Sequence, residues 1–205
     1  MSALYAISRA PEPAPQRLFY HCDMHNHPIQ PFFTNAELFS LSLKILKRYC
    51  LDPFGIHGIN HWTRVLENGA QIAAQTGANM RVVQLFALFH DSRRMNDDRD
   101  PDHGARGAAL AGEMNGSLFM LAPGELALLQ DACIRHTKGF TEADITVQTC
   151  WDADRLDLPR AGKIPVPECL CTAPGRDISF MNKTRERAVA NHLTCFCLEL
   201  RKLLV

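Results

Sequence analysis

MRVVQLFALFHD, residues 80–91, is the stretch of sequence that decides the fold. It is apolar on nearly every side of a helix, which is typical of a helix at the centre of a bundle. It ends in His90 and Asp91, a pair that is costly to bury unless each side chain is paired or bound to a metal. Consecutive helical residues point about 100° apart, so these two side chains can converge on one ion only where the helix ends.

Apolar residues at helical spacing continue on both sides of this stretch, whereas strict alternation typical of strands is rare. Asn35 is expected to cap the first helix, and Thr141 with Asp144 suggests the cap of a later one. The expected helices cover residues 35–49, 59–76, 80–90, 105–114, 125–136, 141–154 and 183–203, with a loop over 159–180. We therefore predict an all-α fold, a compact bundle of about six to eight helices.

The composition divides the chain into two parts. Residues 1–35 are rich in proline, which breaks helices, so we expect a proline-rich N-terminal arm. Residues 36–205 are expected to form the helical core with its C-terminal loop and helix. The arm contains further metal-binding residue types, which we interpret as adventitious because of their proline-flanked setting: His21, Cys22, His25 and His27.

Charge and hydropathy exclude several classes of protein. The formal net charge of zero gives no electrostatic footprint for nucleic acid or an acidic membrane surface. We find neither a secretory signal nor the roughly 20 apolar residues that span a bilayer, and expect a soluble, cytoplasmic protein. The eight cysteines contain no C-x-x-C pair, so free thiols are expected. The apolar C-terminal residues 193–205 fit either the core or a homodimer interface.

Besides His90 and Asp91, three polar residues lie on or next to apolar helical patterns. His61 lies in HWTRV, His136 closes the helix over 125–136, and Asp154 lies in DADRLD. Taken singly, each is more often a hydrogen-bonded core residue or a solvated acid than a ligand. Only their combination and order carry an argument.

That order, H…HD…D, with H-x-x-R-V at the first histidine and A-D-R-L at the last aspartate, resembles the HD-domain phosphohydrolase superfamily. FALFHD, DPDHGARGAALA and IRH extend the resemblance over about residues 36–158, and short, stand-alone members look most similar. The resemblance implies a compact HD-domain bundle and a metal centre. Its ligands would be His61, His90, Asp91 and Asp154. His57 remains open as an alternative to His61, and Asp152 as an alternative to Asp154.

Imidazole and carboxylate ligands suit a divalent transition metal, namely Mn, Fe, Co, Ni or Zn, and Mg is also a candidate. Some HD proteins hold a second ion with additional histidines between the HD pair and the last aspartate. His103 and His136 follow in that order, although His103 equally fits the beginning of the next helix. We expect a single ion.

Nucleotidase-like members carry a glutamate where this chain has Arg94, which argues against deoxynucleoside monophosphates as substrates. A guanidinium there is suited to binding phosphate in a bidentate fork. The expected substrate-binding residues are Arg93, Arg94, Arg106 and Lys138. Asp91 or His136 would accept or donate a proton.

The resemblance implies hydrolysis of a small phosphate ester, by analogy a nucleotide-like one, by a metal-activated water. Catalysis would depend on Asp91, His136 and Arg94. Two alternatives stay open. One is a di-iron HD-fold oxygenase, which needs six ligands and so depends on His103 and His136. The other is a catalytically lapsed metal- or nucleotide-binding module.

Overall fold

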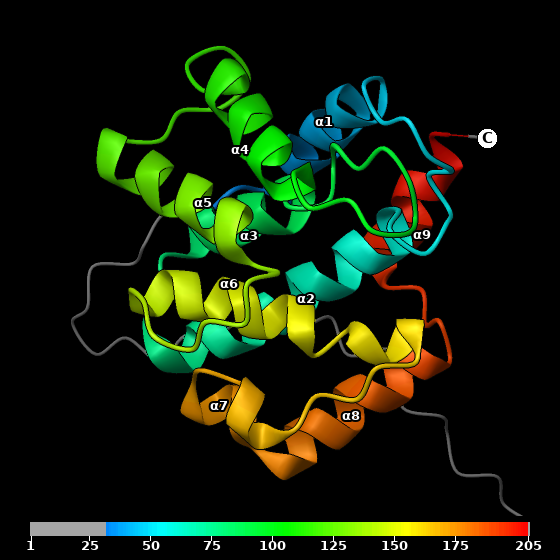
Figure 1. Ribbon diagram of the computed structural model, residues 1–205. Coiled ribbons are helices and arrows are strands. Elements are labelled where there is room, and N and C mark those ends of the chain that lie inside the picture. The colour runs from blue at the N-terminus through cyan, green and yellow to red at the C-terminus, as the bar shows by residue number, and fades with distance from the viewer. Residues whose placement is uncertain (1–31, 205) are drawn as a thin grey trace, which may run out of the picture.

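The computed structural model describes residues 32–204, and these residues form helices and no strand (Figure 1). The predicted all-α class is confirmed. The α-helices are α1 (Asn35–Leu46), α2 (Ile59–Thr76), α3 (Met80–Phe89), α4 (His103–Met114), α5 (Pro123–Arg135), α6 (Ile145–Arg155), α7 (Ala173–Arg176), α8 (Ile178–Val189) and α9 (Cys195–Lys202). Two short 3-10 helices, η1 (Leu158–Ala161) and η2 (Pro167–Cys169), lie between α6 and α7.

Helix α3 forms the centre of the bundle. Every residue from Val82 to Phe89 is buried, as its apolar circumference predicts. The side chain of Asn79 caps the helix by accepting hydrogen bonds from the backbone N–H groups of Arg81 and Val82. Helices α2, α5 and α6 pack around α3, and α4 meets its C-terminal end (Figure 1). The HD pair therefore emerges into the interior of the bundle.

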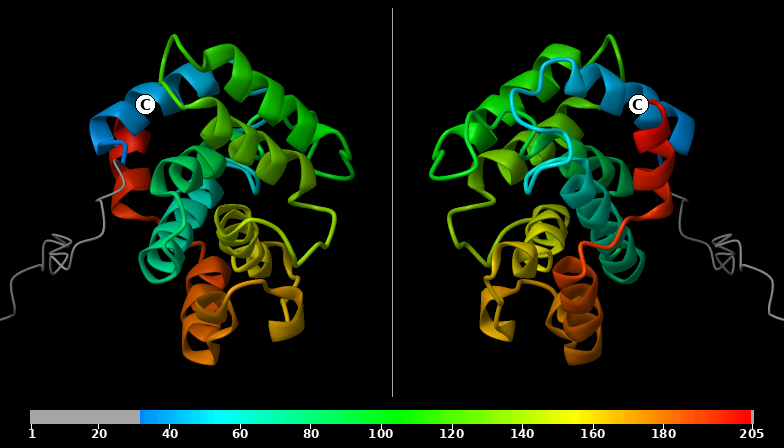
Figure 2. Two further views of the ribbon diagram at one scale, coloured as in Figure 1. Left: turned by 90° about the vertical axis from the view of Figure 1, so that its left-hand side faces the viewer. Right: turned by 90° about the vertical axis from the view of Figure 1, so that its right-hand side faces the viewer.

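Helices α4 and α5 form an antiparallel pair across one end of the bundle, opposite α7 and α8 (Figure 2). Two glycines allow α4 to approach its neighbours. A Cβ atom at Gly107 would lie 2.2 Å from the carbonyl oxygen of Phe89, and one at Gly104 would lie 2.1 Å from that of Cys133. Because real Cβ atoms never come this close, DHGARG is a packing motif that brings α4 against the ends of α3 and α5.

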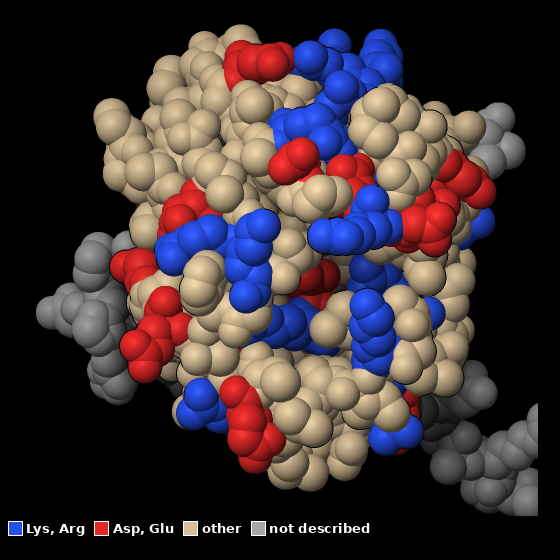
Figure 3. Space-filling view, viewed as in Figure 1, with Lys and Arg blue, Asp and Glu red and all other residues tan. Residues whose placement is uncertain are grey.

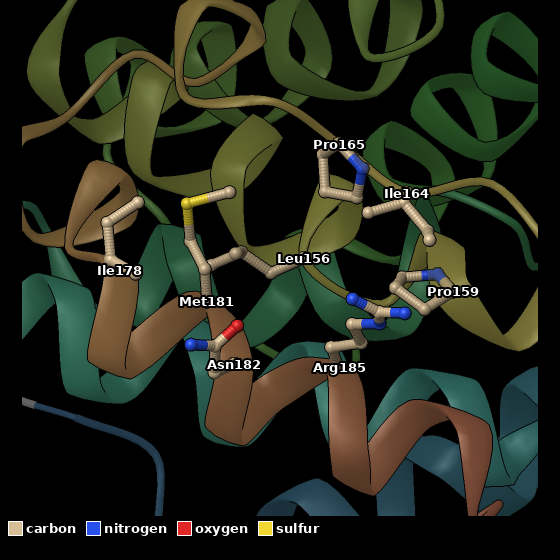
Figure 4. Close-up of a pocket in the computed structure, with 8 residues that line it drawn as sticks. All are labelled: Leu156, Pro159, Ile164, Pro165, Ile178, Met181, Asn182 and Arg185. Atoms are coloured by element: carbon tan, nitrogen blue, oxygen red, sulfur yellow. The ribbon is translucent and has the colours of Figure 1, made fainter.

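The segment after α6 is less loop-like than the sequence predicts, since it contains η1, η2 and α7. The buried carboxylate of Asp152 anchors it by accepting hydrogen bonds from the backbone N–H groups of Cys171 and Thr172, both at 2.7 Å. A cavity of about 130 Å³ opens between this segment and α8 (Figure 4). Its lining is mostly apolar and consists of Leu156, Pro159, Ile164, Pro165, Ile178, Met181, Asn182 and Arg185.

The prediction of one C-terminal helix over 183–203 is wrong. Helix α8 begins five residues earlier, at Ile178, after its cap Asp177, and the chain turns at Asn191, whose φ of 47° lies in the left-handed region. Arg64 on α2 stabilises this turn by donating to Asn191 Oδ1 at 3.0 Å and to the His192 carbonyl at 3.3 Å. Thr194 then caps α9. A long-range contact thus ends a helix that local periodicity would continue.

The beginning of the described chain also differs from expectation. Thr34, not Asn35, caps α1: its hydroxyl accepts from the Glu37 N–H, and the Glu37 carboxylate accepts from the Thr34 N–H. Similarly, the helix expected over 141–154 begins at Ile145, after its cap Asp144. The proline-rich arm up to residue 31, with His21, Cys22, His25 and His27, lies outside the described residues.

Two further findings concern the described residues as a whole. None of their helices combines the length and the apolar character needed to cross a membrane. Their cysteines are free thiols, as the spacing predicted.

We expect Gly107→Ala to destabilise the protein by about 1–3 kcal/mol, because the added methyl group overpacks the α3–α4 contact. Gly124→Ala is the matched control, since a Cβ atom there meets nothing within 4 Å. Urea denaturation of both variants measures the difference. Equal unfolding midpoints would contradict the close approach of α4 to α3.

Candidate metal centre

Five helices bring histidine and aspartate side chains to one buried place. His61 lies on α2, His103 begins α4 and Asp154 lies on α6. His90, Asp91 and His136 directly follow α3 and α5. All six side chains are buried in the bundle. The sequence-predicted quartet and both additional histidines therefore meet.

The first group of side chains that could hold a metal ion, called the first ligand group below, consists of His61, His90 and Asp154. The Nε2 atoms of His61 and His90 are 2.9 Å apart. Asp154 Oδ1 lies 3.4 Å from His61 Nε2 and 3.7 Å from His90 Nε2. Three potential ligand atoms thus face one another across a space the size of an ion.

The second group consists of Asp91, His103 and His136. The Nε2 atoms of His103 and His136 are also 2.9 Å apart. Asp91 Oδ1 lies 3.1 Å from His103 Nε2 and 3.8 Å from His136 Nε2. This group repeats the composition of the first: two imidazoles and one carboxylate.

Asp91 connects the two groups. Its Oδ1 belongs to the second group, whereas its Oδ2 lies 3.6 Å from His61 Nε2 and 3.8 Å from His90 Nε2 in the first. One carboxylate can therefore serve both groups, with one oxygen directed to each.

Hydrogen bonds at Nδ1 determine how these imidazoles face the centre. His61 Nδ1 contacts Asp157 Oδ2 at 2.8 Å, and the other three Nδ1 atoms contact backbone carbonyl oxygens. Carbonyl and carboxylate oxygens only accept, so each Nδ1 donates. In the neutral tautomers all four Nε2 atoms then present lone pairs to the centre. The carbonyl partners are Phe86 for His90, Asp100 for His103 and Cys133 for His136.

Two lone pairs at 2.9 Å repel each other unless a cation lies between them. A shared proton would satisfy only the two nitrogens, whereas a metal ion would also satisfy the carboxylate oxygens. Ligand atoms about 2.1 Å from one ion lie roughly 3–3.4 Å apart, which is close to the separations found here. Histidine and aspartate in this combination fit a divalent transition metal.

The sequence interpretation missed Asp157, which orients His61. Its carboxylate accepts from His61 Nδ1 and, through a fork, from Arg64 Nε at 2.7 Å and Nη2 at 3.0 Å. All three side chains are buried. The contact joins Asp157, the last acid of DADRLD, to Arg64, the arginine of H-x-x-R-V. The sequence could have suggested it only if the two motifs were considered together, because they lie far apart in the chain.

The surroundings favour charged carboxylates and neutral His90. Burial lowers the pKa of His90 to about 3. Burial raises the pKa of Asp91, but attraction to His90 when it is protonated and hydrogen bonds from N–H groups of the neighbouring histidines outweigh it, so that this pKa lies well below its usual value. A bound ion would take the place of the protons on Nε2. Burial raises the pKa of Asp154, but a hydrogen bond from His61 in its doubly protonated form and the charges of the nearby histidines outweigh it and lower this pKa. Burial also lowers the pKa of His136, but the bond to Asp91 and nearby charges leave it raised.

The two open alternatives have distinct positions. His57 joins neither group: its Nδ1 lies 2.9 Å from Asp91 Oδ2, and its Nε2 lies 3.3 Å from the Asp97 carbonyl. Asp152 faces away, toward the segment it anchors after α6. The positions of His61 and Asp154 thus fit the predicted ligand roles.

Of the four predicted substrate-binding side chains, Arg94 borders the centre, with Nη1 at 3.4 Å from Asp91 Oδ1. Arg106 instead pairs with Asp100, and Arg93 donates to the carbonyl of Arg48. Lys138 is exposed beyond the end of α5. An arginine that the sequence interpretation missed, Arg160 on η1, lies 4.0 Å from Asp91 Oδ2.

The molecular surface is hollowed on the face seen in Figure 3. Acidic atoms are visible in the hollow, and lysine and arginine side chains gather around it. Lysine and arginine side chains gathered around a hollow are a setting that attracts a small anion.

Comparison with a solved structure identifies the fold. The crystal structure of a "predicted HD superfamily hydrolase" from an uncultured Thermotogales bacterium matches with a TM-score of 0.56. The match has 23% sequence identity and covers 82% of this chain and 91% of that chain. This chain has the HD-domain fold. No protein-family model and no curated protein gives a match.

The HD-domain fold accounts for the chain order of the site residues. The first histidine lies on α2, the HD pair follows the central helix α3, and the last aspartate lies on the neighbouring α6. The fold expected from the sequence resemblance is thereby confirmed.

We expect Asp157→Asn to weaken metal binding about 10- to 100-fold, because the amide no longer holds His61 in the tautomer that directs its Nε2 lone pair inward. Asp131→Asn, in a partly exposed pair with Arg135, is the control. Competition with a chromophoric chelator measures the dissociation constant of the ion. Unchanged affinity in Asp157→Asn would contradict the orienting role.

Proposed function

We propose that this chain is a metal-dependent phosphohydrolase that cleaves a small phosphate ester at a two-ion centre. One observation carries the proposal: four imidazole Nε2 atoms, paired at 2.9 Å, converge with the carboxylates of Asp91 and Asp154. The sequence favours a single ion. The repeated group of two histidines and one carboxylate supports two.

In this arrangement His61, His90 and Asp154 would hold one ion, His103 and His136 would hold the other, and Asp91 would contribute one oxygen to each group. His136 and Asp91 would then be ligands rather than the proton acceptor or donor that the sequence suggested. When bound, such ions lower the pKa of a water toward neutrality and offset charge on phosphoryl oxygens.

The protein side chains prepare the centre for this chemistry. Asp157 and the carbonyls of Phe86, Asp100 and Cys133 keep all four imidazoles aligned, so little reorganisation is needed on binding. Arg94 is held by the carbonyls of Asn96 and Asp98, which directs its Nη1 toward Asp91. A guanidinium in this position suits a phosphoryl oxygen.

The similar Thermotogales protein is named a predicted HD superfamily hydrolase, which agrees with a hydrolytic role. Phosphate esters are the proposed class because arginines border the ligand groups. A buried cation next to metal ligands is unfavourable unless an anion also binds there.

We expect the wild-type protein to bind two divalent ions per chain and to hydrolyse a generic phosphate ester. His61→Ala and His103→Ala should each lose ions and activity, because each removes a ligand of a different group. His192→Ala, which removes an exposed imidazole, is the matched control. Elemental analysis and p-nitrophenol release under added Mn, Co, Ni, Zn or Mg are the measurements.

If His103→Ala retains all its metal, the centre holds one ion. If both ligand variants retain metal, the site assignment fails. If metal binds but no ester is cleaved, the centre has another function.

A second candidate function is a di-iron oxygenase of the HD fold. The specific observation in its favour is that His103 and His136 complete six ligands with Asp91 as the bridge. Oxygen uptake by the iron-loaded protein tests this candidate. Uptake without ester hydrolysis would favour it over the phosphohydrolase.

A further inference from the structure

We propose that Arg160 binds a non-bridging oxygen of the substrate's phosphoryl group and makes this centre selective for phosphomonoesters over phosphodiesters. This inference rests on the proposed phosphohydrolase function. The sequence interpretation did not single out Arg160, which lies in the η1 turn six residues after Asp154.

The guanidinium of Arg160 is buried and held rigidly. Its side chain is 7% exposed. Its Nε donates to the carbonyl of Ile56 at 2.9 Å, and its Nη1 donates to the carbonyl of Asp157 at 3.1 Å. The bond to Ile56 connects η1 to the segment before α2. Nη1 also lies 3.7 Å from Asp157 Oδ2, which leaves Nη2 as the free end of the fork.

That free end faces the metal centre without an acceptor. Asp91 Oδ2 is 4.0 Å away, beyond hydrogen-bond distance. His57 Nδ1 is 3.5 Å away, but it lies 2.9 Å from the charged Asp91 carboxylate and must donate there, so it does not accept from Arg160. Among the described residues, the Arg160 Nη2 is thus a buried cationic donor aimed into the site with its hydrogen-bonding capacity unused.

Arg94 approaches the same carboxylate. It approaches Asp91 Oδ1, whereas Arg160 approaches Oδ2. The bridging residue is therefore flanked by two guanidinium groups, each fixed by backbone carbonyls. Once metal ions neutralise the carboxylates, these cations are left to bind an anion.

The number of positive groups favours one class of phosphate ester. A phosphomonoester presents three non-bridging oxygens and carries up to two negative charges near neutral pH, whereas a diester presents two and carries one. A centre with two ions and two flanking guanidinium groups can offer a cation to each of the three oxygens and carries more positive charge than a diester monoanion needs. Arg160 would therefore contribute more to monoester than to diester binding.

The test is calorimetric titration of inorganic phosphate into the metal-loaded, full-length protein. We expect Arg160→Gln to weaken phosphate binding about 10- to 100-fold, the range for one charge-assisted hydrogen bond, with unchanged metal content. Arg176→Gln is the matched control, because Arg176 also donates to a backbone carbonyl, that of Leu170, but lies outside the ligand groups.

A second measurement compares kcat/KM for p-nitrophenyl phosphate and bis(p-nitrophenyl) phosphate. Wild type should prefer the monoester, and Arg160→Gln should lose that preference. Equal phosphate affinity in wild type and Arg160→Gln, or no phosphate binding to the metal-loaded wild type, would overturn the proposal. So would loss of metal in Arg160→Gln, which would show a structural role through Asp157.

These outcomes are separable from failure of the proposed function. A protein that hydrolyses neither ester, but binds phosphate in an Arg160-dependent way, keeps the anion site and loses the hydrolase assignment.

Discussion

The buried carboxylate of Asp91 is surrounded by arginines and by histidines that could bind a metal ion. Its two oxygens face different histidine pairs, and Arg94 approaches one oxygen while Arg160 approaches the other. A buried charge is tolerated only when opposite charges and hydrogen bonds replace water. Five helices meet this need, because each of them brings a histidine or aspartate side chain to the same buried place around Asp91.

This arrangement opposes ordinary packing, since the centre of a small bundle would normally be apolar. The polar cluster lies where helices begin or end, so backbone carbonyls of the last helical turns are available to orient the imidazoles. Gly104 and Gly107 of α4 let the backbones at the ends of α5 and α3 approach this cluster closely. Arg64 extends the network outward: it holds Asp157 on one side and the turn at Asn191 on the other, so the C-terminal helices depend on the same contacts as the metal centre.

Much of the fold was predictable from local sequence. The apolar circumference of α3 indicated the central helix, and the pattern of α2 gave its bounds, because both signals arise from residues within one helix. The ends of the chain were less predictable. The division between α8 and α9 depends on Arg64, more than a hundred residues earlier, so helical periodicity continued across it. The predicted cap of α1, Asn35, lies one residue after the observed cap, Thr34.

The sequence by itself determined which residue types were available and on which helices they would lie. It indicated the set of histidines and aspartates, since motif order and residue chemistry are properties of the chain. Tertiary structure decided which atoms meet: that Asp91 faces two groups, that Asp152 turns away while Asp157 orients His61, and that Arg160 reaches the centre. The physical reason is that local sequence patterns do not fix contacts between residues far apart in the chain. Side-chain direction at a helix end changes by about 100° per residue, so convergence from five helices depends on how those helices pack.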